Sequence, residues 1–207
     1  TGGTVNFTLA CRPPTPANDE CAGAVTLTVN PTSVCNISSN GTTIGADESL
    51  PACSGSADDD VWYQFTATNP THVIAVTPTT LTDAVFEVFE GTCVGGLTSW
   101  SCNDATTGNE VEGGVISGLT VGNNYYVRVY SNPLDIGFGT FSICITTPPN
   151  PCNAVPPSLT CNTTQSDTIV PGYGSYGISG CGLTTNGVEQ LYSFIPDSTA
   201  SYSIVQN

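Results

Sequence analysis

Hydrophobic and polar residues alternate along eight short stretches of the chain, which is the pattern of half-buried β-strands. In the stretch 124–131, for example, Tyr125, Val127 and Val129 share one face. The eight stretches are 24–29, 60–67, 72–78, 83–91, 97–101, 110–118, 124–131 and 139–146. We find no long segment with the 3.6-residue apolar period of a helix. The pattern predicts an all-β fold, with antiparallel strands in a two-sheet sandwich of jelly-roll type.

The start of this strand series recurs later in the chain. PANDECAGAVTLTV (16–29), followed by DVWYQF (60–65), resembles PNPCNAVPPSLT (149–160), followed by EQLYSF (189–194). The spacing from Cys53 to Phe65 matches that from Cys181 to Phe194 within one residue. Such internal similarity is the mark of tandem repeats.

The ends of the units repeat as well. A strand followed by a proline-rich joint occurs in GGTVNFTLACRPPTPANDEC (2–21) and again in FGTFSICITTPPNPC (138–152). We therefore expect residues 1–12 to be the last strand of a preceding repeat, 17–146 to be one complete repeat, and 149–207 to be the first half of a following one. The proline-rich joints predict short, stiff linkers between repeats.

The ten cysteines indicate disulfides and an oxidising compartment, because no C-x-x-C pair and only one histidine are present for a zinc site. Six cysteines fall in the complete repeat and allow fifteen pairings. We favour Cys93–Cys102 across a short hairpin-like loop, Cys35–Cys53, and Cys21–Cys144 between the first and last strands. By analogy Cys161 pairs with Cys181, which leaves Cys11 and Cys152 without partners in this chain.

The charge balance restricts the partners. Seventeen acidic residues face only two basic ones, for a net charge of −15. Nucleic acids and anionic membrane surfaces are bound through clustered Lys and Arg, so both are excluded as partners. No apolar span is long enough for membrane insertion, and no export signal opens the chain, so we expect a mature segment of a longer secreted protein.

Two stretches carry a family resemblance. DAVFEVFEG (83–91) and CNDATTGNEVEGGVISGLTVGNNYYVRVYS (102–131) resemble the bacterial pre-peptidase C-terminal domain, a family that includes clostridial collagen-binding domains. The start NDECAGAVTL with DDDVWYQF looks like the version found in very large Bacteroidetes surface proteins, exported by the type IX system that serves gliding motility. The resemblance implies a β-sandwich located outside the cell. It says little about function, because the same module serves as spacer, adhesin and peptidase appendage.

Acidic residues cluster before two predicted strands, where they would repel one another unless a hard cation lay between them. In the resembling collagen-binding domains such positions bind calcium, and carried onto this chain they become Asn18, Asp19, Asp58 and Asp60. The chain departs from the family at Pro16 and Ala17, where a glutamate is common. The second copy keeps only Glu189 of these acids, so a Ca²⁺ site is expected in the complete repeat alone.

Catalysis has little support in the sequence. The only histidine, His72, lies in an alternating strand, which favours a structural role over that of a general base. Trp62 and Trp100 could stack on sugars, but both lie in predicted strands and are interpreted as packing residues.

We therefore expect a non-enzymatic repeat of a large secreted or cell-surface bacterial protein that acts in adhesion or as an extended stalk. Its partners would be neighbouring repeats and, where it is adhesive, surface glycans or extracellular matrix protein. Two alternatives remain open. One is a C-terminal accessory module for secretion or targeting of an extracellular peptidase or glycosidase, and the other is a calcium-dependent glycan- or collagen-binding module.

Overall fold

The structure is a computed structural model that describes residues 13–132, 137–148, 158–166, 192–196, 198–199 and 201–205. It forms two compact units, Thr1–Pro148 and Pro149–Asn207. No helix in the described ranges is long and apolar enough to cross a bilayer.

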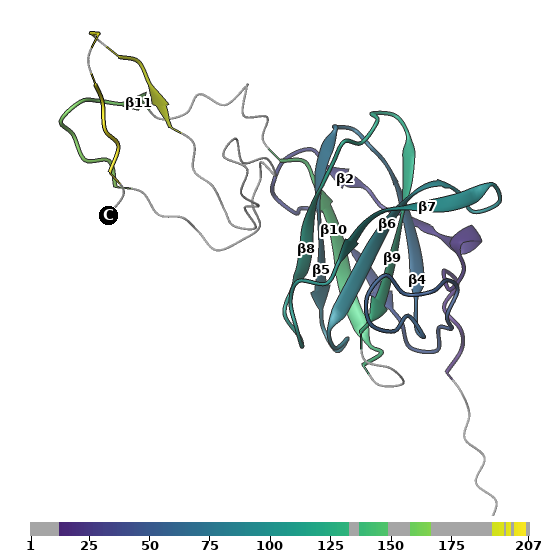
Figure 1. The fold of residues 1–207 in the computed structure, drawn as a ribbon. Coiled ribbons are helices and arrows are strands. Elements are labelled where there is room, and N and C mark those ends of the chain that lie inside the picture. Colours follow the sequence, from purple (N-terminus) through teal and green to yellow (C-terminus); the bar gives the residue numbers. More distant parts are fainter. Residues whose placement is uncertain are drawn as a thin grey trace, which may run out of the picture. The chain divides into compact units, whose positions relative to one another are not determined.

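The first unit is a sandwich of two sheets (Figure 1). In order across the first sheet, the strands are β1 (Val25–Thr26), β4 (Val61–Thr66), β9 (Asn124–Ser131), β6 (Ala84–Thr92) and β7 (Gly96–Asn103). The second sheet contains β2 (Val29–Asn30), β10 (Thr140–Thr146), β5 (Thr71–Pro78) and β8 (Glu112–Ser117), with β3 (Ser39–Thr42) paired to β10. A short 3₁₀ turn, η1 (Cys21–Gly23), precedes β1. The predicted all-β sandwich is confirmed.

All eight predicted stretches contain strands, and the first contains two. Within 24–29, β1 joins one sheet and β2 joins the other, and Leu27 between them is buried in the core. The sequence prediction missed β3, because its residues Ser-Asn-Gly-Thr show no apolar alternation. Gly41 in this strand lies under Tyr63 and Phe141, where a side chain would have no room.

Alternation of side chains builds the core between the sheets. Tyr125, Val127 and Val129 of β9 are buried there as predicted, together with Ile143 and Ile145 of β10. The larger rings of the core belong to Phe65, Phe86 and Phe141.

The six cysteines of the complete repeat all form disulfides, but the favoured pairing is wrong. The bridges are Cys21–Cys93, Cys35–Cys144 and Cys53–Cys102. Their Cα atoms lie 5.6, 6.3 and 6.1 Å apart, within the usual disulfide range.

The register of the β6–β7 pair explains why the predicted Cys93–Cys102 bridge does not form. Cys102 lies opposite Glu87 in the β6–β7 pair, well along the strand from Cys93, so these two cysteines do not meet across the hairpin. Cys93 instead bridges to η1, and Cys144 in β10 bridges to the segment that follows β2. Spatial neighbours in a sandwich come from strands distant in sequence, which chain spacing alone does not reveal.

The second unit contains a short parallel pair, β11 (Ser158–Leu159) with β12 (Ser193–Phe194). The rings of Phe194 and Tyr202 contact each other at 4.8 Å between centroids. Cys161 is exposed and unbridged within the described residues. Its predicted partner Cys181 lies outside them, as do Cys11 and Cys152, so that pairing stays a prediction. The assignment of 1–12 and 149–207 to neighbouring repeats also stays a prediction.

Candidate functional site

Residues 43–60, which we call the cover segment, lie across the outer face of β4, β9 and β6. Ser49 Oγ accepts a hydrogen bond from Trp62 Nε1 at 2.8 Å, and the hydroxyl of Tyr130 donates to Ser54 O at 2.8 Å. Cys53 fixes the segment to the edge strand β7 through Cys102. This face of the sheet, which alternation alone would assign to solvent, is therefore buried.

Arg128 of β9 is the centre of the contacts beneath the cover segment. Its guanidinium contacts Asp60 Oδ2 at 3.1 Å and Glu87 Oε2 at 2.7 Å, and the arginine side chain has no exposed surface. It also donates to the carbonyl oxygens of Leu50 and, at 2.8 Å, of Pro51. One buried arginine thus forms ion pairs with two carboxylates and holds the cover segment.

Aromatic rings surround the same guanidinium. Its carbon lies 5.9 Å from the centroid of Trp62, 5.7 Å from Phe89 and 5.1 Å from Tyr130, within the range of cation–π attraction. The rings of Trp62 and Phe89 are 5.3 Å apart. Trp62 is fully buried and cannot act as a sugar platform.

The acidic run before β4 has structural partners. Asp59 accepts hydrogen bonds from the backbone N–H and the hydroxyl of Ser131, both at 2.9 Å, and burial raises its pKa. Burial raises the pKa of Asp60 to about 6, against the opposing effects of Ser49 and Arg128, which favour the charged form. Both carboxylates anchor the start of β4.

The residues predicted to bind calcium have varied surroundings. Asn18 Nδ2 donates to Trp62 O at 3.0 Å, and Asp19 Oδ1 accepts from the backbone N–H of Asp47 at 2.7 Å. Asp60 does not fit a calcium ligand as it lies, because the guanidinium of Arg128 contacts the same carboxylate. Among the described residues no three Asp, Glu, His or Cys side chains converge on one point. Calcium binding by Asn18, Asp19 and Asp58 stays a prediction.

A pocket of about 510 Å³ lies beside this acidic run. Asp47, Glu48, Asp58 and Asp59 supply its charge, while Ile44 and Phe138 are among its apolar lining residues. Its volume falls in the range of small-molecule sites, and no basic side chain lines it. Its electrostatic character favours cationic groups over anionic ones.

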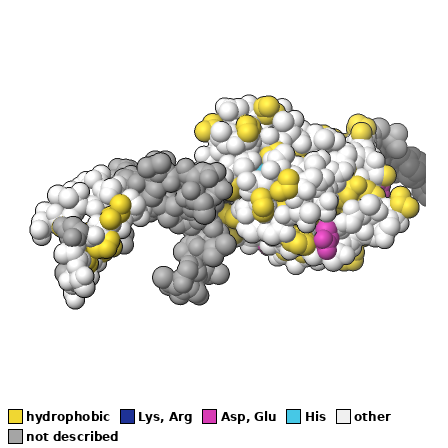
Figure 2. Space-filling model, turned by 90° about the horizontal axis from the view of Figure 1, so that it is seen from above, with side chains coloured by type: hydrophobic (Ala, Val, Ile, Leu, Met, Phe, Trp, Pro, Cys, Tyr) yellow, Lys and Arg dark blue, Asp and Glu magenta, His cyan; other side chains and the backbone are white. Residues whose placement is uncertain are grey.

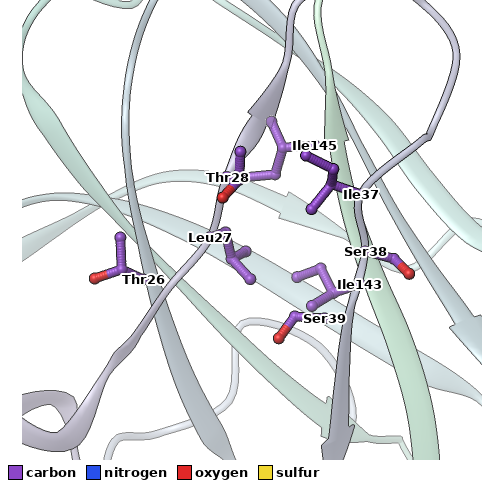
Figure 3. Close-up of a pocket in the computed structure, with 8 residues that line it drawn as sticks. All are labelled: Thr26, Leu27, Thr28, Ile37, Ser38, Ser39, Ile143 and Ile145. Atoms are coloured by element: carbon purple, nitrogen blue, oxygen red, sulfur yellow. The ribbon is translucent and has the colours of Figure 1, made fainter.

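A smaller pocket of about 110 Å³ lies where the chain passes from β1 to β2. Figure 3 shows the apolar side chains Leu27, Ile37, Ile143 and Ile145 near the centre of this pocket, with Thr26, Thr28, Ser38 and Ser39 at its border. Uncharged hydroxyls around an aliphatic floor offer hydrogen bonds and apolar contact without charge.

His72 has no exposed surface. Its Nε2 accepts hydrogen bonds from the backbone N–H groups of Thr68 and Asn69 at 3.1 and 3.2 Å, and Nδ1 lies 3.2 Å from Thr146 O. Burial lowers the pKa of the imidazole, so the neutral form with hydrogen on Nδ1 satisfies all three contacts. These contacts match the predicted structural role.

Trp100 is the more exposed tryptophan, with 39% of its surface accessible. It is the extra residue of a β-bulge, since Ser99 and Ser101 pair with Phe89 and Val88 and leave Trp100 unpaired. Its Nε1 donates to Ser117 O at 3.2 Å, which fixes the ring at the open edge between β7 and β8.

In the view of Figure 2 the described surface is mostly uncharged polar, with scattered hydrophobic side chains and few acidic ones.

Sequence reasoning missed the buried cluster of Arg128, Asp60 and Glu87. Alternation places Arg128 on the face of its strand opposite Tyr125, Val127 and Val129, and it does not reveal what covers that face. The sequence did contain a signal for this cluster, because one of only two basic residues stands in the middle of a hydrophobic strand. Such a charge is expected to have acidic partners.

The fold and these contacts define a disulfide-bonded β-sandwich module whose polar clusters hold the fold together. The chain belongs to the family of galactose-binding-domain-like modules associated with the type IX secretion system, whose model matches residues 17–143. The chain is also similar to the crystal structure of the pre-peptidase C-terminal domain of a collagenase from Bacillus anthracis. That similarity has 18% identity and a TM-score of 0.37, and it covers 57% of this chain and 94% of the other. No curated protein matches the chain.

Family membership and the three disulfides indicate a secreted protein. The matched family is one of accessory modules, not of catalytic domains.

Proposed function

We propose that residues 17–146 form a non-catalytic repeat of a large secreted or cell-surface protein, acting as part of an adhesive or extended stalk. The observation that carries this proposal is the position of the Cys35–Cys144 bridge, which joins residues 109 positions apart near the two ends of the module.

This bridge defines a short covalent path for tension. A pull applied at residues 17 and 146 passes from Cys35 directly to Cys144, so residues 36–143 lie outside the path. A module built this way resists extension even if its hydrogen bonds yield. That property suits a repeat that transmits force between neighbouring domains.

The sequence gives independent support. The start motif recurs at 149–160, and the proline-rich segment between the copies is of the stiff type. Neighbouring repeats of the same chain are then its first partners.

A replacement experiment in the parent protein tests the role. Exchanging residues 17–146 for an unrelated disulfide-bonded sandwich of similar length should preserve export and surface display. If the module is a stalk, attachment of cells survives the exchange. If it is adhesive, attachment is lost while display is kept. Loss of export itself would contradict both roles and favour the secretion-accessory alternative.

The family description favours glycan binding as a second candidate function. The hydroxyl-lined pocket of Figure 3 has the uncharged, amphipathic chemistry that a sugar ring requires. A glycan array with and without EDTA tests this. The variant Ser38→Tyr, at an exposed lining position, should abolish any binding without lowering the melting temperature. Binding that survives Ser38→Tyr would rule out this pocket, and an array without hits would rule out the function.

A further inference from the structure

Four acidic side chains are buried among the described residues: Asp59, Asp60, Glu87 and Glu112. In the first three, both carboxylate oxygens accept hydrogen bonds from serine or arginine. Glu112 differs from them. It has no exposed surface, and its Oε1 has no hydrogen-bond partner in the described part of the chain.

The second oxygen of Glu112 fixes where the carboxylate points. Oε2 accepts from the backbone N–H groups of Ala105 and Thr106 at 3.0 and 2.9 Å, and from the Thr106 hydroxyl at 2.9 Å. The carboxylate is therefore held against the loop 105–108 by Oε2, while Oε1 has no hydrogen-bond partner in the described residues.

Asp83, which directly precedes β6, reaches the same loop. Its backbone N–H donates to Gly108 O. Its Oδ1 is also buried without a hydrogen-bond partner in the described residues. Glu112 and Asp83 thus each have one unsatisfied buried carboxylate oxygen, and both residues form hydrogen bonds to the same loop, Glu112 at Ala105 and Thr106 and Asp83 at Gly108.

The protein has little positive charge to offer them. Of its two basic residues, Arg128 is engaged with Asp60 and Glu87, and Arg12 lies outside the described residues. A buried carboxylate without a counter-charge is costly, and proteins normally pair it or coordinate it to a metal.

We propose that Glu112 and Asp83 bind a Ca²⁺ ion at the loop 105–108, a site separate from Asn18, Asp19, Asp58 and Asp60. Two carboxylates balance the ion's charge, and backbone carbonyls of the loop with water complete the six to eight oxygens that calcium requires. The absence of sulfur and nitrogen ligands from this pair argues against zinc. The ion would join the residue that precedes β6 to the start of β8, beside the loop that connects β7 with β8.

Calcium titration of the whole chain by isothermal calorimetry, with melting temperatures in calcium and in EDTA, tests the proposal. We expect calcium binding to the wild type and a higher melting temperature in calcium. Glu112→Gln and Asp83→Asn should each weaken binding at least tenfold. Glu110→Gln, an exposed acid of the same loop, is the matched control and should bind normally.

Melting temperatures measured in EDTA distinguish a calcium-ligand role of Glu112 from a purely structural one. Without calcium, Glu112→Gln should melt at or above the wild type, because it removes an uncompensated charge while Gln keeps an acceptor for Ala105 and Thr106. A wild type that does not bind calcium would overturn the proposal. So would binding that survives Asp83→Asn but is lost in the double variant Asp19→Asn, Asp58→Asn.

Crystals soaked in calcium give a readout that needs no variant. The proposal requires an anomalous peak at about 2.3–2.6 Å from Glu112 Oε1. A peak only at Asp19 or Asp58, or no peak at saturating calcium, would refute it.

Discussion

At the scale of single residues, this protein depends on a few buried polar groups in a chain that has only two basic residues. Arg128 holds two carboxylates and two carbonyl oxygens, and His72 accepts two backbone N–H groups. Both side chains are fully buried, so water cannot take their place as hydrogen-bond partners when they are substituted. Substitutions at these positions should therefore have large effects.

Replacement of Arg128 by Met should destabilise the fold by about 3–5 kcal/mol, because Asp60 and Glu87 would keep their buried charges without a counter-charge. Chemical denaturation of the oxidised protein measures this. The triple variant R128M, D60N, E87Q removes those charges and should recover part of the loss. A loss below about 1 kcal/mol in R128M would contradict the assigned role of the cluster.

His72 should make stability fall as the pH drops. Its pKa is lowered in the folded state, so the unfolded chain takes up the proton more readily, and the stability present above about pH 6.5 is lost on acidification. The raised pKa values of Asp59 and Asp60 act in the opposite direction, so the comparison must be with His72→Gln. Between about pH 7.5 and about pH 5, the wild type should lose more stability than the variant. Parallel pH profiles would show that His72 does not titrate on unfolding.

At the scale of strands and segments, the sequence predicts what alternation encodes and no more. Every stretch with alternating residues became a strand, down to the alternate burial of Tyr125, Val127 and Val129. Alternation could not reveal β3, because the packing of this strand depends only on a glycine, Gly41, beneath the rings of Tyr63 and Phe141. Nor could it reveal that the cover segment buries the outer face, since that depends on contacts between residues up to 78 positions apart.

Gly41 should therefore be intolerant of substitution. A Cβ there would lie 2.0 Å from the Tyr63 hydroxyl and 2.5 Å from a ring carbon of Phe141. We expect Gly41→Ala to cost about 1–3 kcal/mol, because both rings belong to the packed interior. Asn40→Ala, exposed in the same strand, serves as control and should change stability by less than about 0.5 kcal/mol. Equal melting temperatures for the two variants would refute the close packing at β3.

At the scale of the whole molecule, the disulfides set the properties that matter for function. The sequence correctly predicted that the six cysteines of the complete repeat form disulfides, but chain spacing could not supply the pairing. The predicted Cys21–Cys144 bridge would have removed residues 22–143 from the tension path, and the observed Cys35–Cys144 bridge removes residues 36–143. In the structure the three bridges span 72, 109 and 49 residues.

Single-molecule pulling on the chain, with handles flanking residues 17 and 146, tests the proposed tension path most directly. In the oxidised protein, residues 36–143 should add no contour length at any force that leaves the covalent bonds intact. Full reduction should add roughly 360–390 Å for the 109-residue separation released between Cys35 and Cys144. An oxidised protein that already releases this length would contradict the account.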